Sequence, residues 1–181
     1  MATYSVMAAG FGGQGVMLLG KIIAEAAMHD GKNVTWLPSY GPEMRGGTAN
    51  CTVVISDEDI GSPVVDKPDI VIAMNIPSMI KFEKELKDDG ILLINSSVVD
   101  REPTRKDIKT FKINANDIAN KIGNLKVLNM VALGAFIQSS GIITFDSVKK
   151  ALKETMTGNK EKFLDLNINA VQKGMEEIKE M

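Results

Sequence analysis

The chain of 181 residues is long enough to bury one substantial hydrophobic core, which favours a single domain over residues 1–181. With 21 basic and 23 acidic residues the net charge is -2, which argues against a nucleic-acid-binding face. No apolar run approaches the ~20 residues of a membrane span. The N-terminus lacks the pattern of a secretory signal, so we expect no membrane contact and a cytoplasmic location.

The first structural unit is a strand, a glycine-rich turn, a helix and a second strand. Residues 4–9 are apolar and predict a short buried strand. Apolar residues then recur at helical spacing from 16 to 27, and residues 33–37 predict the second strand. This order is typical of the opening of a parallel α/β sheet.

The next predicted strand, residues 48–56, lies between two loops that lack a helix. A parallel crossover usually contains a helix, so we expect this strand to run antiparallel to its neighbours. The remaining alternation predicts strands at 69–74, 91–95 and 110–113, and helices from 77 toward 90, from 114 to 121 with Asn114 as the side-chain cap, and in three pieces from 128 to the end.

These elements predict an α/β fold, Rossmann-like, with three layers in the order α/β/α. The sheet is expected to be mostly parallel with one antiparallel strand, and the C-terminal third to be helical. In the last helix an apolar seam is predicted to face the core, formed by Leu164, Ile168, Val171, Met175 and Ile178.

A glycine-rich turn follows the first predicted strand. Gly10, Gly12 and Gly15 satisfy the G-x-G-x-x-G pattern in the expected context, and Gly13 and Gln14 add conformational freedom and a side-chain amide. Residues without side chains permit a tight turn, and the N–H groups at the start of a helix favour an anion. The pattern is compatible with an anion or partner site, with a dinucleotide site, or with close packing alone.

The dinucleotide interpretation lacks one component. A site for NAD or FAD requires an acidic residue roughly 20 residues further on, at the end of the second strand, to bind a ribose hydroxyl. This chain has Leu37, Pro38 and Ser39 there, and the next acidic residue is Glu43 in the following loop.

A second glycine-rich segment, residues 39–47, is predicted at the same edge of the sheet. Tyr40 offers an aromatic ring, and Arg45 offers a planar guanidinium suited to carboxylate or phosphate. We therefore predict a ligand or partner edge, with an ion pair between Glu43 and Arg45 as the structural alternative. The segment consists of Ser39, Tyr40, Gly41, Pro42, Glu43, Met44, Arg45, Gly46 and Gly47.

Other polar and reactive residues give weaker signals. Asn95 and Ser96 end a third strand at this edge and are candidates for lining the site, but they are equally ordinary turn residues. Cys51, the only cysteine, is expected to be a buried inert thiol, and His29, the only histidine, a helix-terminal cation. One thiolate cannot hold an iron–sulfur cluster, so we assign no metal site and no catalytic acid, base or nucleophile.

Both glycine-rich segments, taken together, resemble the gamma subunits of 2-oxoacid:ferredoxin oxidoreductases. The resemblance rests on residues 11–15 and 40–47, and extends to Asn75 with Pro77, to residues 95–97, and to Asn129 with residues 132–134. It covers about residues 5–141 and is closest to the 2-oxoglutarate type, with the branched-chain 2-oxoacid type nearby.

The resemblance implies one subunit of a larger enzyme, inactive alone. Alpha and beta subunits of such enzymes hold thiamine diphosphate and Mg, and iron–sulfur clusters, in some cases in a ferredoxin-like delta subunit, pass electrons to ferredoxin. The acyl group passes to coenzyme A. For this chain the resemblance implies no bound cofactor of its own and a coenzyme A or partner edge at residues 12–15 and 40–47.

One further expectation and two alternative functions follow from the residues themselves. Apolar surface meant for partners favours a homodimer when the chain is isolated. A stand-alone nucleotide-binding reductase and a non-catalytic docking module remain the alternative functions.

Overall fold

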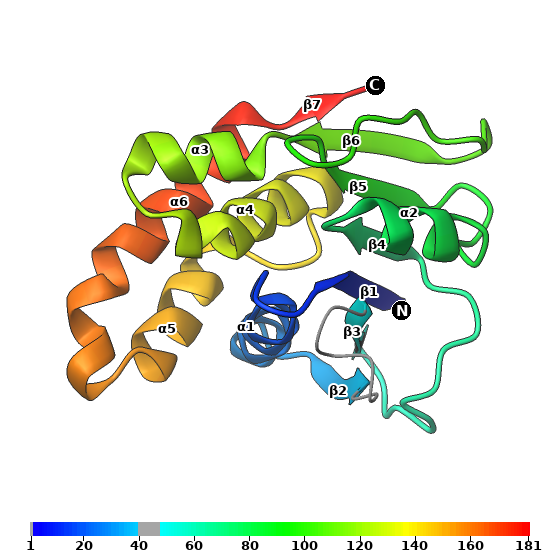
Figure 1. Ribbon diagram of the computed structural model, residues 1–181. Helices are drawn as coiled ribbons and strands as arrows, with labels where there is room; N and C mark the ends of the chain where they lie inside the picture. Colours follow the sequence, from blue (N-terminus) through cyan, green and yellow to red (C-terminus); the bar gives the residue numbers. More distant parts are fainter. Residues whose placement is uncertain (1, 40–47) are drawn as a thin grey trace.

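The computed structural model describes residues 2–39 and 48–181, which form a seven-stranded mixed sheet with helices on both faces (Figure 1). The strands are β1 (Thr3–Phe11), β2 (Asn33–Ser39), β3 (Thr48–Ser56), β4 (Ile70–Ala73), β5 (Ile91–Asn95), β6 (Lys109–Ile113) and β7 (Lys179–Glu180). The helices are α1 (Val16–His29), α2 (Ile76–Glu83), α3 (Ala115–Ile122), α4 (Leu128–Ser140), α5 (Phe145–Thr155) and α6 (Leu164–Glu177), with 3-10 helices η2 (Leu125–Val127) and η3 (Gly158–Phe163).

The strand order is β2-β3-β1-β4-β5-β6-β7. β1, β4, β5 and β6 are parallel neighbours, whereas β3 is antiparallel to both β1 and β2. The predicted fold class and the antiparallel strand at 48–56 are therefore confirmed. β2 runs in the same direction as β1, but β3 lies between them, so the first two strands in the chain do not pair.

The connection from β5 to β6 is parallel although its residues, 96–108, contain no helix. The segment is instead pinned to α2. The buried carboxylate of Glu83 accepts hydrogen bonds from the Thr104 hydroxyl (2.9 Å) and the Arg105 N–H (2.8 Å). Arg105 also donates to the Leu86 carbonyl and pairs with Asp107. These long-range hydrogen bonds hold the connection against the sheet and α2, where a parallel connection usually has a helix.

The core has two parts, one on each face of the sheet. The smaller part packs α2 against β1, β4 and β5 through residues such as Met79, Phe82 and Val71. The larger part contains the remaining helices. Its centre is α4, buried on all sides from Leu128 to Ile137 because the sheet lies on one side and α6 packs on the other.

α4 and α6 approach so closely that two glycines are needed at their crossing. A Cβ atom on Gly134 would lie 1.9 Å from the Val171 carbonyl oxygen, and one on Gly174 would lie 1.9 Å from the Val131 carbonyl oxygen. The buried residues of α6 differ from the predicted apolar seam, and Val171 is the only residue in both sets. The buried residues are Asn167, Ala170, Val171 and Gly174, with Leu164, Ile168 and Met175 only partly buried.

The prediction of helix to the very end of the chain was wrong. α6 ends at Glu177, which leaves Ile178 outside the helix. Residues Lys179–Glu180 form β7, antiparallel to β6, and the Met181 N–H donates to the Thr110 carbonyl (2.9 Å). The chain turns back because β6 would otherwise expose unpaired backbone groups along the sheet edge.

A carboxylate joins the end of α1 to the start of α5. Asp30 accepts hydrogen bonds from the N–H and hydroxyl of Thr144 (2.8 and 2.9 Å) and from the Ser147 hydroxyl. Burial opposes ionisation of Asp30, but the hydrogen bonds from Ser147 and Thr144 outweigh it and hold the pKa of this carboxyl below its usual value.

We expect Asp30→Asn to lower the free energy of unfolding at pH 7 by about 1–2 kcal/mol, because its donors lose a charged acceptor. The folded-state pKa is the lower one, so the stabilisation is present above the unfolded value of about 4 and is lost as the pH falls through the folded value. Urea unfolding at pH 7 and pH 3 should show the gap to the native chain closing in acid. Asp66→Asn, at an exposed position, is the control; equal losses for both variants at pH 7 would contradict this role.

Candidate functional site

The glycine turn, residues 10–15, joins β1 to α1 at the carboxyl edge of the sheet. Gly13 and Gly15 have φ values of +93° and +72°, a region that other residues rarely adopt. A Cβ on Gly10 would lie 2.6 Å from the Gln14 Oε1 and 2.8 Å from the Met74 Cβ. The turn thus requires glycine for backbone conformation at two positions and for space at Gly10.

Gln14 holds this turn to the neighbouring strand. Its Oε1 accepts the Phe11 N–H (2.7 Å), and its Nε2 donates to the Met74 carbonyl (2.9 Å). We predicted an amide available at the mouth of the site. In the structure both ends of this amide already tie the end of β1 to the end of β4.

The start of α1 presents backbone N–H groups that no side chain of the described residues caps. Gly15 is the N-cap, and the first turn carries no acidic residue. The first N–H groups of a helix have no intrahelical acceptor, and the helix dipole favours an anion there. Asn129, buried in the first turn of α4, donates from Nδ2 to the Gly15 carbonyl (3.1 Å) and fixes the turn from below.

Asn129 is the positioning residue that the periodicity of the sequence did not reveal. It lies far from the turn in the chain, and its own surroundings are an apolar helix. The only sequence signal was its place within the family resemblance, beside residues 132–134.

The second glycine-rich segment attaches beside the first. Ser39 at the end of β2 pairs with Asn50, and Phe11 at the end of β1 pairs with Thr48. Both flanks of the segment therefore lie at the same edge of the sheet as the glycine turn, Thr48 beside Phe11 and Ser39 two strands away from it. Of the predicted site residues, Tyr40, Gly41, Pro42, Glu43, Arg45, Gly46 and Gly47 lie outside the described residues.

Asn95 to Ser97 serve the start of α3. The Asn95 Oδ1 accepts the Ala115 N–H (3.2 Å), and the Ser97 hydroxyl accepts the Asn116 N–H (3.1 Å). Asn114 occupies the N-cap position but makes no side-chain cap, contrary to our prediction. Its Oδ1 instead accepts the Ser96 hydroxyl (3.0 Å), because the end of β5 already provides the cap.

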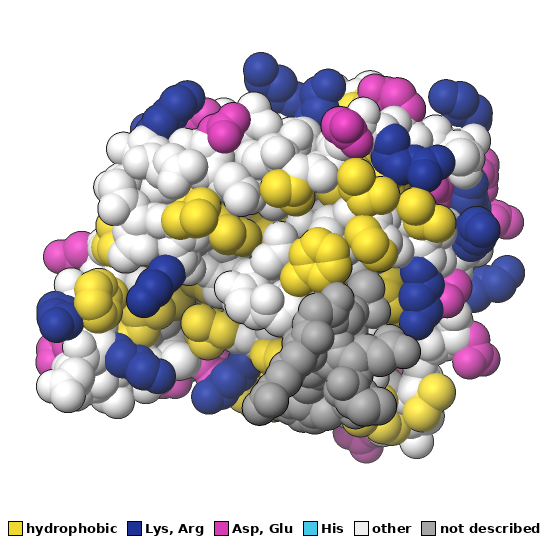
Figure 2. Space-filling model, in the orientation of Figure 1, with side chains coloured by type: hydrophobic (Ala, Val, Ile, Leu, Met, Phe, Trp, Pro, Cys, Tyr) yellow, Lys and Arg dark blue, Asp and Glu magenta, His cyan; other side chains and the backbone are white. Residues whose placement is uncertain are grey.

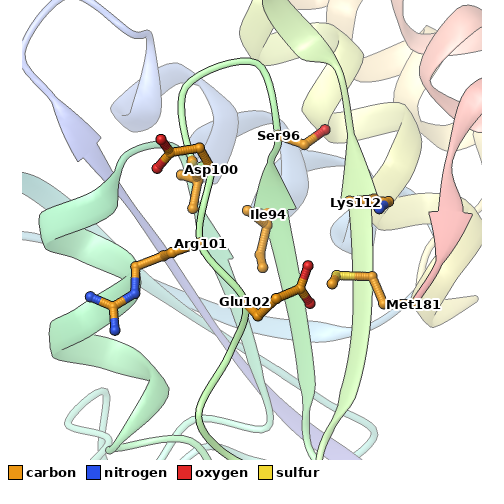
Figure 3. A pocket seen from close by; sticks show the side chains of 8 residues that line it. Ile94, Ser96, Asp100, Arg101, Glu102, Lys112 and Met181 are labelled. Atoms are coloured by element: carbon orange, nitrogen blue, oxygen red, sulfur yellow. The ribbon is translucent and has the colours of Figure 1, made fainter.

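Ser96 opens toward a different hollow from the glycine turn. Figure 3 shows it above β5 near Lys112 of β6, with Glu102 and Met181 across the gap and the Arg101 side chain directed away from it. This hollow has a volume of about 190 Å³. β4 separates β5 from β1, so the structure does not bring Asn95 and Ser96 into the glycine turn.

Two buried polar atoms lie beside the carboxyl end of β4. Asn75 caps α2 by accepting the Ser78 N–H (2.8 Å). Its Nδ2 and the Ser78 hydroxyl are buried and have no hydrogen-bond partner among the described residues. Buried polar groups normally have hydrogen-bond partners, so these two atoms are unsatisfied polar groups beside the carboxyl edge of the sheet.

The topology disfavours a dinucleotide site. In such sites the strand beside β1 ends with the acidic residue that binds the ribose. Here that neighbour is the antiparallel β3, and the end of β2 lies two strand spacings, roughly 10 Å, from β1. The chain thus lacks both an acidic residue at Leu37 to Ser39 and the arrangement of β2 directly beside β1 that would bring such a residue to the ligand.

Cys51 and His29 have structural surroundings. Cys51 is buried beneath α1, its thiol donates to the Val16 carbonyl (3.5 Å), and burial raises its pKa to about 11. His29, in the last turn of α1, has its Nε2 3.0 Å from the carboxylate of Glu154 in α5.

Within residues 2–39 and 48–181, no cluster of three or more metal-binding side chains occurs. In the same ranges, every helix is too short or too polar to cross a bilayer.

A mixed α/β sheet with a tight glycine turn at its carboxyl edge is typical of α/β proteins that bind a ligand at that edge. The family model described as pyruvate ferredoxin/flavodoxin oxidoreductase matches residues 5–177. The chain therefore belongs to this family.

Two curated relatives show how the chain fits within the family. It is 40% identical over 177 residues to the ketoisovalerate oxidoreductase subunit VorA of Methanothermobacter thermautotrophicus, covering 97% of this chain and 36% of that one. It is 37% identical over 180 residues to the 2-oxoglutarate synthase subunit KorC of Methanothermobacter marburgensis, covering 95% of each. The chain thus spans about a third of the first relative and nearly all of the second.

Solved structures agree with the fold. A keto/oxoacid ferredoxin oxidoreductase gamma subunit from Geobacter sulfurreducens is 34% identical, with a TM-score of 0.87 over 98% of this chain and 97% of that chain. The 2-oxoglutarate:ferredoxin oxidoreductase of Magnetococcus marinus, solved with 2-oxoglutarate, coenzyme A and succinyl-CoA, is 25% identical, with a TM-score of 0.88 over 97% of this chain and 31% of that chain. The predicted resemblance to gamma subunits of 2-oxoacid:ferredoxin oxidoreductases is therefore confirmed.

Proposed function

We propose that this chain is the gamma subunit of a 2-oxoglutarate:ferredoxin oxidoreductase and works only within that complex. The complex would decarboxylate the 2-oxoacid, transfer the acyl group to coenzyme A and pass the electrons to ferredoxin. The similarity to a 2-oxoglutarate synthase subunit over 95% of both chains supports the choice of substrate.

The composition of the chain supports a complex in which the partner subunits, and not this chain, hold the redox cofactors. Its only cysteine is buried and hydrogen-bonded to a backbone carbonyl, so its residues do not fit an iron–sulfur cluster. Its only histidine pairs with Glu154. We assign thiamine diphosphate, Mg and the clusters to alpha, beta and ferredoxin-like delta partners, and no catalytic residue to this chain.

The glycine edge is the part of this chain that we propose meets coenzyme A. The observation that carries this proposal is the start of α1, where Gly15 provides no side-chain cap for the first N–H groups and the first turn of the helix has no acidic residue. These groups, with the Arg45 guanidinium, would bind an anionic phosphate of the ligand. Coenzyme A supplies the thiol that accepts the acyl group. The residues of this chain hold and orient the ligand.

Arg45→Ala tests this assignment in the complex assembled from all its subunits. We expect the KM for coenzyme A to rise about tenfold with little change in the KM for 2-oxoglutarate, because one charge-assisted contact is lost. Arg101→Ala, at an exposed position beside another part of the edge, should leave both constants unchanged. An unchanged KM for coenzyme A, or a failure of assembly with normal kinetics in the residual complex, would favour a docking role for the edge instead.

A further inference from the structure

A groove lies where the first turn of α1 meets η2, α5, η3 and α6. Its apolar floor is formed by Leu18, Val127, Met156 and Leu166, and its volume is about 400 Å³. Figure 2 shows hydrophobic side chains gathered over this part of the molecule, at the left of the view, with Lys, Arg, Asp and Glu side chains around them. A hollow of this size accommodates several side chains of another protein.

The outer wall of the groove contributes nothing to the core of this chain. η3 is six residues long and has no buried residue, and Phe163 at its end is 41% exposed. Runs of 3-10 helix longer than three or four residues are uncommon because their hydrogen bonds are poorly aligned. An irregular wall that presents a half-exposed aromatic ring to an apolar floor is typical of an interface anchor rather than of a folding element.

Both charged side chains that line the groove are lysines. The acidic residues of the adjoining wall, Glu161 and Asp165, are not among its lining residues. Lys126 and Lys160 line it, and the Lys162 Nζ lies 5.1 Å from the centre of the Phe163 ring. In the described part of the chain none of these three lysines forms an ion pair. Among the residues that the structure describes, no carboxylate lines the groove, although the chain as a whole carries a net charge of -2.

We infer that this groove docks an acidic amphipathic segment of a partner subunit. Apolar side chains of the segment would fill the floor against Phe163, and its carboxylates would lie on Lys126 and Lys160. Leu18 belongs to the first turn of α1, so the docked segment would sit beside the glycine turn. The inference rests on the proposed function, since it requires the partner subunits of that complex.

Charge reversal tests the inference on the assembled complex. We expect the double variant Lys126→Glu with Lys160→Glu to join the partner subunits with about tenfold weaker affinity at low salt, and the defect to shrink as salt is added. The matched control reverses two exposed lysines elsewhere, Lys84→Glu with Lys106→Glu, and should join normally. Thermal unfolding of each isolated variant checks that the fold is retained.

A photo-crosslinking phenylalanine analogue at position 163 identifies the occupant. The expected product joins this chain to a partner-subunit peptide that combines Asp or Glu with apolar residues. Crosslinks only to a second copy of this chain, loss of crosslinking on adding coenzyme A alone, or normal assembly of the charge-reversed variant would overturn the inference. If the unaltered chain fails to join any partner, the proposed function itself is wrong.

Discussion

Gly134→Ala should lower the free energy of unfolding by about 3 kcal/mol, the largest loss that we expect from any single methyl group in this chain. The added Cβ would lie 1.9 Å from the Val171 carbonyl oxygen, which is backbone and cannot rotate away. Alanine is the better helix former by about 1 kcal/mol, so a net loss would show that helix contact outweighs helix propensity.

Urea unfolding measures this loss, with Gly61→Ala as the control because no described residue lies within 4 Å of its added Cβ. Gly174→Ala makes the reciprocal contact with Val131 and should behave alike. Once one alanine has pushed α4 and α6 apart, the second costs less, so the double variant should lose less than the sum. A Gly134→Ala variant as stable as the native chain would show that the two helices do not cross this closely.

Gly15→Ala should have the second largest effect, because two costs combine at one position. Its φ of +72° is unfavourable for alanine by about 1–2 kcal/mol. The added Cβ would also lie 2.4 Å from the Asn129 Nδ2, so it displaces the side chain that positions the turn. We expect about 2 kcal/mol of lost stability, less than for Gly134→Ala, and, in the assembled complex, a rise of about tenfold or more in the KM for coenzyme A.

Gly13→Ala separates the two costs. Its φ is +93°, yet none of the residues that the structure describes lies within 4 Å of the added Cβ, so we expect the cost to come from backbone strain. Adding Asn129→Ala to Gly15→Ala removes the crowding and should recover part of the lost stability. Equal losses for Gly13→Ala and Gly15→Ala would mean that Asn129 plays no part in holding the turn.

Much of the sheet follows from local pattern. β4 has four buried residues in an unbroken apolar run, as expected for a central parallel strand. The glycines of the turn predict its tight geometry, and residues 48–56 form the antiparallel strand that their helix-free flanks indicate.

The same reasoning fails between β5 and β6. Residues 96–108 also lack a helix, yet β6 is parallel to β5. Glu83 and Arg105 hold this segment, and their contacts join residues about 20 positions apart. No periodic pattern records such bonds. β7, two residues long, is likewise too short to leave a periodic signal.

The roles of polar residues at the edge were hardest to predict for a related reason. Gln14 and Asn95 have the side chains that a ligand site would use, and the structure shows their amides engaged with Met74 and with Asn116. Residue type predicted hydrogen bonding correctly. The partner depends on strand order and register, which place distant segments together.

We propose that this chain provides a binding and docking edge and that its partner subunits carry the redox chemistry. The most direct test measures 2-oxoglutarate-dependent reduction of ferredoxin with coenzyme A for three samples: this chain alone, its partner subunits alone, and the complete set. We predict no turnover by the chain alone, little or none by the partners, and full activity when they are combined. Turnover by the purified chain, or tight binding of NAD or FAD to it, would contradict the account.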